Sequence, residues 1–497
     1  MPNIDHNHPP HPELTNVLPG KRRTRPVSPQ PSSINQFRSM LPSMSWPAIS
    51  SPQATGLMSM LLQLEQTQWL KPEQILTEQF KQLNRLVHFS RRYSPYYWKR
   101  LAHLKKENPA TLFTSLEEWR QVPILTREDL QNAGKNLHCE IQPKGHGPGN
   151  PSISSGSTGR PVTVFRNNIS SLVWQAITIR DHFWHKRQVG GKQAIIRLIK
   201  NDRGAPPPDG IVNPNWGPPT TLIFNTGQAM VMDIASSTIK QQADWLIRHN
   251  PDYLLSYPTN VHALAEHFRQ TNSKLPNLKE VRTLSESLSS EARLACQEVW
   301  GVPVSDMYSA EEVGYIALQC PENTHYHIQS ENLLVEILND ADQPCKPGEI
   351  GRVVVTTLHN FVSPLIRYEI GDYAEAGPET CSCGRGLPII NQVMGRSRNL
   401  LILPSGDRAW PIFGLSRYGK IAAIRQVQMI QHTRENIEVR LVVSEPLTPD
   451  QEAQLVGLFH ETLGYSFKLD LRYLDIIPRQ KGGKFEEFIS KIHPATV

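Results

Sequence analysis

Residues 154–161 read Ser-Ser-Gly-Ser-Thr-Gly-Arg-Pro, and the rest of the chain can be ordered around this stretch. Two glycines among four hydroxyl residues make it too flexible and too polar for the interior of a helix or strand. Residues 162–165, Val-Thr-Val-Phe, follow it and predict a strand. The backbone N–H groups and hydroxyls of such a loop can bind phosphate oxygens, with an arginine as counter-charge. The residues that we expect at a phosphate are Ser154, Ser155, Gly156, Ser157, Thr158, Gly159 and Arg160.

This loop is not the Walker phosphate loop, which has four residues between its glycines and ends in Lys-Ser/Thr. A plain connector remains the alternative interpretation, because Ser/Gly loops are common in proteins. The stretches that surround the loop in the sequence therefore decide its meaning.

The composition suits a large protein with a substantial hydrophobic core. The chain has 497 residues, 38% of them hydrophobic and 20% charged, with a net charge of +6. No apolar run approaches the ~20 residues that cross a bilayer, and no hydrophobic signal segment follows the start. We therefore expect no membrane span and a cytoplasmic protein. The sequence shows no Cys/His finger spacing or aromatic-basic repeat, so nucleic acid is not an expected partner.

The chain divides into a tail and two predicted domains. Residues 1–56 are rich in Pro, Ser, Asn and His, with a basic cluster at 21–25, and we expect them to be disordered. Residues 57–395 form the larger predicted domain. Residues 396–497 mix strand and helix patterns and form a smaller α+β domain, with a hinge near Arg398.

Within the larger domain, strand and helix patterns alternate after the loop, which predicts an α/β domain with a largely parallel sheet. A Pro/Gly turn at 347–348 joins two β-rich runs further on, which predicts an antiparallel subdomain. The predicted strands are 194–199, 229–232, 253–257, 278–284, 334–338 and 352–358, and the predicted helices lie in 57–104, 239–249 and 261–269.

Five further stretches give the loop its context. They are Ser-Glu-Ser-Leu at 285–288, Tyr-Ser-Ala-Glu-Glu at 308–312, Pro-Leu-Ile-Arg-Tyr-Glu-Ile-Gly-Asp at 364–372, Gly-Arg-Ser-Arg-Asn at 395–399, and Pro-Arg-Gln-Lys-Gly-Gly-Lys at 478–484. Together with the loop, and in this order, they resemble the signature motifs of the adenylate-forming superfamily, in particular the phenylacetate-CoA ligase branch, often called CapK-like. The resemblance extends over residues from about 75 to 490 and implies a mobile C-terminal lid.

The resemblance implies a role for individual residues. Tyr308 would stack on adenine, and Glu312 would hold the Mg²⁺ that bridges the ATP phosphates. Asp372 would accept hydrogen bonds from the ribose hydroxyls, and Arg396 would contact ribose or phosphate. Lys484 would offset the charge that grows as a carboxylate attacks the α-phosphate. Residues 285–288 would wall the pocket, with a helix N-cap at Ser285 or Ser287 as the alternative.

The chain departs from the family pattern at several positions. Ser309 stands where the family has Gly, and Glu311 stands in place of a Thr or Ser, so either glutamate of the pair could ligate the metal; we favour Glu312. Arg398 and Asn399 replace two acidic hinge residues. Lys481 competes with Lys484 for the catalytic role.

A cysteine–histidine set resembles a structural zinc site seen in this branch. Zinc prefers thiolate and imidazole ligands in tetrahedral geometry. The expected ligands are Cys320, His327, Cys381 and Cys383, with His325 as the alternative histidine and reduced loop cysteines as the alternative interpretation.

The resemblance implies activation of a carboxylic acid, with an aromatic acid as first choice, by ATP and Mg²⁺ to acyl-AMP. The acyl group would then pass to the thiol of CoA or of a carrier protein's phosphopantetheine arm. An amide or ester ligase and a non-catalytic nucleotide-binding relative remain alternatives. The sequence leaves the oligomeric state open, a homodimer included.

Overall fold

The computed structural model describes residues 36–104, 108, 111–153, 162–199, 204–411, 415–480 and 482–492. Its N-terminal part is helical, and prolines at the first turn begin three of the helices, where a fixed φ suits the helix and no N–H is lost. Thr126 caps a later helix reciprocally with Asp129. These helices are α1 (Pro52–Thr67), α2 (Pro72–Tyr93), α3 (Pro95–Arg100), α4 (Leu116–Trp119) and α5 (Arg127–Ala133), followed by the 3-10 turn η3 (Gly134–Leu137).

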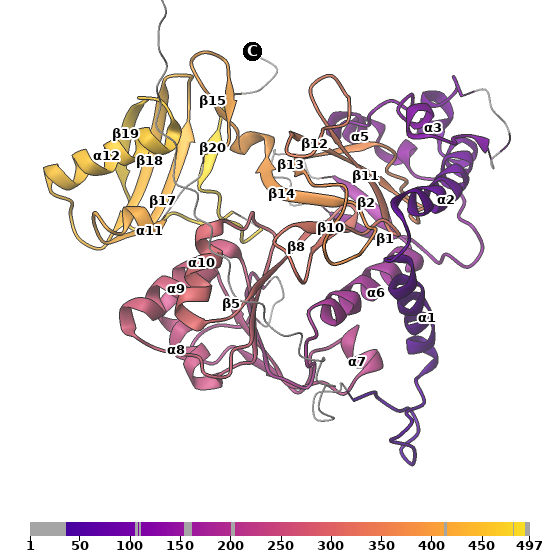
Figure 1. Cartoon of the computed structure of the whole chain (residues 1–497), viewed down its shortest axis with the longest axis horizontal. Helices are drawn as coiled ribbons and strands as arrows, with labels where there is room; N and C mark the ends of the chain where they lie inside the picture. The colour runs from indigo at the N-terminus through magenta and orange to yellow at the C-terminus, as the bar shows by residue number, and fades with distance from the viewer. Residues whose placement is uncertain are drawn as a thin grey trace, which may run out of the picture. The chain divides into compact units, whose positions relative to one another are not determined.

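A twelve-stranded mixed sheet forms the centre of the molecule (Figure 1), in the order β11-β12-β13-β14-β10-β9-β8-β7-β6-β3-β5-β4. Its strands are β3 (Gln193–Arg197), β4 (Ile211–Asn213), β5 (Ala229–Asp233), β6 (Tyr253–Ser256), β7 (Glu280–Leu284), β8 (Val304–Ala310), β9 (Gly314–Gln319), β10 (Tyr326–Ile328), β11 (Leu333–Leu338), β12 (Ile350–Thr357), β13 (Tyr368–Ala376) and β14 (Ile389–Arg396).

The parallel and antiparallel parts predicted from the sequence are halves of this one sheet. Strands β5, β3, β6, β7 and β8 are parallel, whereas β8 onward to β14 and the far edge β11 pair antiparallel. The predicted α/β class is confirmed, and the β-rich subdomain continues the sheet. The intervening helices are α6 (Asn168–Trp184), α7 (Thr220–Ile223), α8 (Ile239–His249), α9 (Pro258–Thr271) and α10 (Ser290–Trp300).

Helices cover both faces of the parallel half. In Figure 1, α8, α9 and α10 lie on one side of it and α6 with α1 on the other. Each group of helices contributes to its own hydrophobic cluster. The first cluster includes Trp245 and Phe268, and the second includes Leu57 and Ile177. The polar loops beyond the strand ends are left free for ligands.

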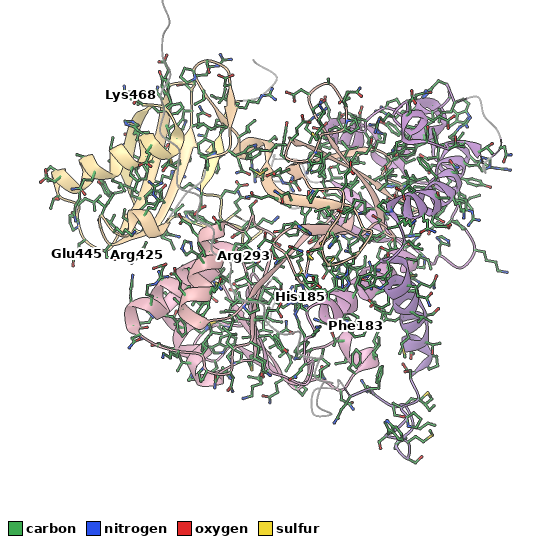
Figure 2. All side chains as sticks on the ribbon, viewed as in Figure 1. Phe183, His185, Arg293, Arg425, Glu445 and Lys468 are labelled. Atoms are coloured by element: carbon green, nitrogen blue, oxygen red, sulfur yellow. The ribbon has the colours of Figure 1, made fainter. Side chains whose placement is uncertain are left out.

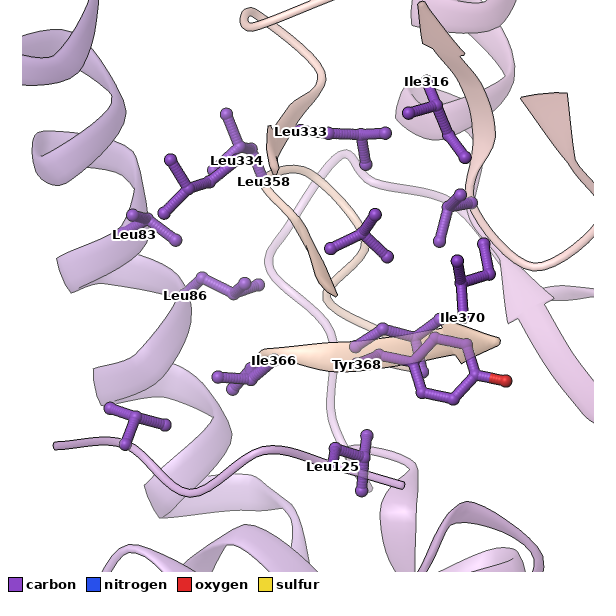
Figure 3. Close-up of a cluster of buried hydrophobic side chains, with 14 of the residues drawn as sticks. Leu83, Leu86, Leu125, Ile316, Leu333, Leu334, Leu358, Ile366, Tyr368 and Ile370 are labelled. Atoms are coloured by element: carbon purple, nitrogen blue, oxygen red, sulfur yellow. The ribbon is translucent and has the colours of Figure 1, made fainter. Parts of the chain in front are cut away.

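The antiparallel half has its own core. Leu83 and Leu86 of α2 point toward Leu333, Leu334 and other apolar side chains of the strands in Figure 3. Each such side chain, fully buried, contributes about 1.5–3 kcal/mol relative to exposure. This packing fixes the strands that bear the candidate site described below.

The C-terminal part has a separate hydrophobic cluster that includes Met429, Leu455 and Phe459. Its sheet runs β19-β18-β17-β20, and charged side chains such as Arg425, Glu445 and Lys468 lie on its exposed surface (Figure 2). The elements are η4 (Ser397–Asn399), β15 (Leu401–Ile402), β16 (Arg408–Ala409), α11 (Leu415–Tyr418), β17 (Ile424–Gln431), β18 (Asn436–Val443), α12 (Pro449–Leu463), β19 (Lys468–Tyr473) and β20 (Phe488–Ser490). The mixed α+β composition agrees with the sequence.

The segment before α1 contacts the body of the protein. Phe37 forms an isolated bridge with Phe224, and α1 begins at Pro52, inside the segment that the sequence assigns to the tail. Among the described residues, no helix is both long enough and apolar enough to cross a membrane.

Candidate active site

Asp372 and Arg396 form the centre of the candidate site. They lie opposite each other on β13 and β14, so the strand register brings them together. The Arg396 Nε lies 2.8 Å from Asp372 Oδ1, and the Tyr308 hydroxyl donates a 2.8 Å hydrogen bond to Asp372 Oδ2. The carboxylate raises the pKa of Arg396, while burial and the same carboxylate raise the pKa of Tyr308. Three residues predicted at the nucleotide are therefore one hydrogen-bonded unit.

Glu312 lies in the turn between β8 and β9, next to this unit. Its side chain is 5% exposed, and its Oε1 lies 3.5 Å from Arg127 at the start of α5. Its charge acts on Arg396 and Tyr368. Glu311, in contrast, is 67% exposed and pairs with Arg166. The geometry therefore favours Glu312 as the glutamate of the site.

Lys484 reaches the same site from the C-terminal part. Burial and the Arg396 guanidinium lower the pKa of its ammonium, whereas Asp372 and Glu286 act in the opposite direction. Its loop turns tightly, because the Gly483 N–H donates to Gln480 O at 2.7 Å and Gln480 N–H to Lys484 O at 2.9 Å. Lys484 is thus the lysine that shares the field of Asp372 and Arg396; Lys481 lies outside the described residues.

Glu286 holds this lysine-bearing loop, a role that the sequence did not predict. Its Oε1 accepts hydrogen bonds from the Phe485 N–H at 2.7 Å and from Arg479 at 3.1 Å. Its Oε2 accepts from the N–H and hydroxyl of Thr259, at 3.1 and 2.7 Å, and Arg479 also donates to the Thr259 hydroxyl. No local sequence pattern indicated this contact, because Glu286 and Phe485 lie 199 residues apart in the chain.

The alternative interpretation of residues 285–288, a helix N-cap at Ser285 or Ser287, is wrong. Ser289 caps α10, its side chain accepting from the Ala292 N–H. Ser285 instead has a positive φ of 70°, a left-handed backbone conformation in the turn after β7. This turn presents Glu286 toward the C-terminal loop.

Arg398 and Asn399, which depart from the family's hinge pattern, both form contacts within the C-terminal part. The Asn399 side chain accepts from Arg396 N–H at 2.9 Å and donates to Phe488 O at 2.6 Å. Arg398 Nε donates to Glu486 at 2.9 Å. These contacts explain how an amide and a cation can stand where the family has acids.

The phosphate-loop residues Ser154, Ser155, Gly156, Ser157, Thr158, Gly159 and Arg160 lie outside the described residues. Their flanks are an antiparallel hairpin of β1 (Asn150–Ile153) and β2 (Thr163–Arg166), which contains the predicted strand. Ser152 and Arg166, one on each strand, both donate to the Glu311 carbonyl. These contacts tie the hairpin to the Glu311–Glu312 turn, where a small cavity of about 20 Å³ is lined by Arg166, Trp174, Glu312 and Asn360 among others.

The chain is similar in sequence to several known proteins. Residues 413–491 match the family described as the CapK C-terminal domain. Phenylacetate-coenzyme A ligase of Thermus thermophilus is 23% identical over 459 residues, covering 84% of this chain and 97% of the relative. Protein CapK of Staphylococcus aureus is 23% identical over 416 residues, covering 78% and 84%. This chain is a relative of phenylacetate-CoA ligase and CapK.

The fold is that of the adenylate-forming ligases. The crystal structure of 2-hydroxyisobutyryl-CoA ligase, in the postadenylation state in complex with R3-HIB-AMP, superposes with a TM-score of 0.64 at 16% identity. The match covers 83% of this chain and 89% of that ligase. The resemblance stated from the sequence motifs is therefore confirmed.

The predicted zinc ligands of this CapK relative also converge. The ligand atoms of Cys320, His325, His327 and Cys381 all lie within 4.8 Å of one another. Cys381 Sγ lies 3.1 Å from His325 Nε2, so His325, which the sequence offered as the alternative to His327, belongs to the set together with His327. Cys383 Sγ lies outside the four but 3.3 Å from His327 Nε2. Two thiols and two imidazoles fit a tetrahedral Zn²⁺.

Arg127 is a further residue near the site that was not predicted from the sequence. Arg127 begins α5 and lies beside Glu312 and Tyr368. No local sequence pattern indicated that the start of this helix faces a glutamate 185 residues later in the chain.

Proposed function

We propose that this protein is an AMP-forming acid–thiol ligase. It joins a carboxylic acid to the α-phosphate of ATP, giving acyl-AMP and pyrophosphate, and transfers the acyl group to a thiol, that of CoA or of a carrier protein's phosphopantetheine arm. The observation that carries the proposal is the delivery of Lys484 to the Asp372–Arg396 pair. Two relatives, phenylacetate-CoA ligase and 2-hydroxyisobutyryl-CoA ligase, are named for acids joined to CoA.

The reaction requires positive charge, because a carboxylate must approach a phosphate. Lys484 and Arg396 supply two cations, and the loop at 154–160 supplies N–H and hydroxyl donors to the phosphates. Asp372 accepts hydrogen bonds from the ribose hydroxyls, and Tyr308 holds Asp372 in place while its ring faces adenine. These groups are positioned before the substrates arrive, which lowers the cost of reaching the transition state.

Glu312 is the residue that would hold Mg²⁺. Its buried carboxylate offers the hard oxygen ligand that Mg²⁺ prefers. When bound, Mg²⁺ neutralises phosphate charge.

The C-terminal part, residues 396–497, acts as the lid. After acyl-AMP forms, we expect it to turn about residues 396–399 and withdraw Lys484, so that a thiol reaches the acyl carbonyl. The Glu286 contacts with the lid are polar and few, and can be released without exposing a hydrophobic core. An enzyme that consumes ATP and CoA is expected in the cytoplasm.

An aromatic acid is the first candidate substrate, because the Thermus relative is named for phenylacetate. The test is carboxylate-dependent exchange of pyrophosphate into ATP, measured with aryl, arylacetic and fatty acids. Exchange with one class supports adenylation and names that class. Adding CoA, carrier protein or amine acceptors to the same acid then separates a thioester ligase from an amide or ester ligase. ATP binding with no exchange across the whole panel would contradict the proposal and favour a non-catalytic relative.

We further propose a structural Zn²⁺ at Cys320, His325, His327 and Cys381, where the His327 ring nitrogen Nδ1 approaches Leu387 O at 3.2 Å and so orients the ring. The site lies between β9, β10 and the 381–383 loop, and its metal would tie them together. Purified protein should contain one zinc by elemental analysis, and Cys381→Ser should lose it and lower Tm. Cys139→Ser, a buried cysteine elsewhere, is the control. Wild-type protein that is purified from zinc-supplemented cultures and contains no metal would contradict the proposal.

A further inference from the structure

An ion pair between Arg398 and Glu486 joins the hinge segment to the loop that carries Lys484. Arg398 lies in η4, and its Nε donates to Glu486 Oε1 at 2.9 Å, while its Nη2 donates to the same oxygen. The two side chains are mostly buried, with 21% and 13% of their surface exposed. Partly buried pairs are screened by salt much less than surface pairs. The pair therefore fixes the loop relative to the hinge.

Gln480 holds the same carboxylate from the other end of the loop. Its Nε2 donates to Glu486 Oε2, and its Oε1 accepts from Arg398 at 3.5 Å. Its backbone closes the turn around the lysine, because its N–H donates to Lys484 O at 2.9 Å and its carbonyl accepts from the Gly483 N–H at 2.7 Å. Lys484 thus lies between two residues, Gln480 and Glu486, whose side chains are bonded to each other.

The loop has further anchors on both sides of the hinge contact. Glu486 O accepts from Gln428 Nε2 of β17 at 2.9 Å, and Phe488 O accepts from Asn399 Nδ2 at 2.6 Å. Arg398 and Asn399, the two hinge residues that depart from the family pattern, therefore both bind the segment that follows the lysine. The departures in the hinge and the structure of the lysine loop belong together.

The charge of Glu486 also acts on the lysine. Burial and the Arg396 guanidinium lower the pKa of the Lys484 ammonium, while the carboxylates of Asp372, Glu286 and Glu486 act in the opposite direction. Of these three carboxylates, Glu486 is the one in the C-terminal part, so it accompanies the lysine wherever the loop goes. An ammonium that offsets a growing negative charge must stay protonated.

We propose that Glu486 is a positioning residue for Lys484, held in place by Arg398 and Gln480. The inference rests on the proposed ligase function, because Lys484 is used there in acyl-AMP formation. It also gives a reason for the cation at position 398. An acid at this position, as the family has, would face the Glu486 carboxylate and repel it.

Separate assays of the two half-reactions test the proposal. Glu486→Gln should slow acyl-AMP formation by about tenfold, because hydrogen bonds to a charged group are weakened, with the KM for ATP near wild type. The rate falls at high pH as Lys484 loses its proton, and in this variant the fall should begin at lower pH. Formation of thioester from supplied acyl-AMP should stay near wild type. Glu445→Gln, exposed in the same domain, is the control.

Variants of Arg398 separate the position of the carboxylate from its charge. Arg398→Lys should keep most of the rate, and Arg398→Ala should be slow without an earlier fall at high pH, since Glu486 remains. Arg398→Asp, which restores an acid, should be slower than Arg398→Ala. The double variant Arg398→Ala/Glu486→Gln should be no slower than the slower single variant. Additive losses, or equal losses in both half-reactions, would overturn the proposal.

Chemical labelling examines the lysine without turnover. Acetic anhydride acetylates the neutral amine, so mass spectrometry over a series of pH values gives a labelling midpoint for Lys484. Glu486→Gln should lower this midpoint and leave that of Lys491, exposed in the same domain, unchanged. An unchanged midpoint for Lys484 would overturn the proposal. Absence of carboxylate-dependent pyrophosphate exchange in the wild type would instead contradict the ligase function, and the labelling would still decide whether Glu486 acts on Lys484.

Discussion

The two sides of the candidate site are held by different kinds of structure. On the body side, Tyr308, Asp372 and Arg396 lie on three strands of one sheet, and the register of β13 with β14 sets the central pair. On the lid side, Lys484 lies on a loop that enters from another sheet and is held by hydrogen bonds to Glu286. A sheet register cannot change without breaking many bonds, whereas a few polar contacts can be exchanged for water.

This difference assigns different tasks to the two sides. In the proposed mechanism, the body side binds and orients the nucleotide in every step. The lid side would contribute its lysine only while the Glu286 contacts last. Changes on the lid side should therefore affect formation of acyl-AMP and leave both nucleotide binding and thioester formation from supplied acyl-AMP largely intact.

The largest effect is expected for Lys484→Ala. Loss of the cation beside Asp372 and Arg396 should slow acyl-AMP formation by about 10²–10³-fold, the usual cost of removing one group that stabilises developing charge. ATP binding, measured by calorimetry, should change little. Lys491→Ala, at an exposed position of the same domain, is the control. Unchanged pyrophosphate exchange in Lys484→Ala would remove this residue from the mechanism.

Glu286→Gln tests whether the contact between lid and body serves one half-reaction only. The variant keeps the size of the side chain but loses the charge that accepts from Arg479 and the Phe485 N–H. Hydrogen bonds to a charged group contribute about 1.5–3 kcal/mol, so acyl-AMP formation should fall by about tenfold or more. The rate from supplied acyl-AMP and thiol should remain near wild type. Equal losses in both half-reactions would show that Glu286 supports the fold or pocket in general.

Gly483→Ala tests the close approach of the lid loop. A Cβ at this position would lie 2.7 Å from Leu198 Cβ and 2.9 Å from the Tyr257 hydroxyl, and φ is +78°. The left-handed backbone alone costs about 1–2 kcal/mol, so adenylation should fall by about tenfold. Gly457→Ala, in α12 with open space around it, is the matched control and should stabilise the lid slightly. Normal adenylation in Gly483→Ala would show that the loop need not approach the body this closely.

The same contrast explains what the sequence could predict. The strands at β3, β5, β6 and β7 follow from β-rich runs between helix patterns, and Asp372, Arg396 and Lys484 follow from motifs whose order survives in the chain. No local sequence pattern indicated which side chains meet across the sheet. Glu286 was identified only as a pocket wall, and Arg127 at the start of α5 was not identified, because their partners Phe485 and Glu312 lie about two hundred residues away.

The sequence also did not indicate two other features, the choice of histidine at the cysteine–histidine cluster and the ordered segment before α1. Nothing in the spacing of Cys320, His325 and His327 could decide which imidazole turns toward Cys381, since that depends on the register of β9 with β10. The apolar residues at 37–49 were assigned to the tail on composition, because the contact that holds them, Phe37 on Phe224, joins segments that are far apart in the chain.

The smallest expected effect concerns pH. Burial, with Glu286 and Glu291 nearby, raises the pKa of Glu487 from 4.5 to about 8. The folded protein therefore binds a proton that the unfolded chain releases between these values, so this carboxyl makes stability fall as pH rises from about 4.5 to 8, with no further loss above. Glu487→Gln should remove that loss. Its Tm should exceed that of the wild type by an amount that grows across this interval and then levels off, a few degrees at most. Glu435→Gln, exposed in the same domain, should show no such trend. A difference in Tm that does not change with pH would mean that burial does not raise the pKa of Glu487 in the folded protein.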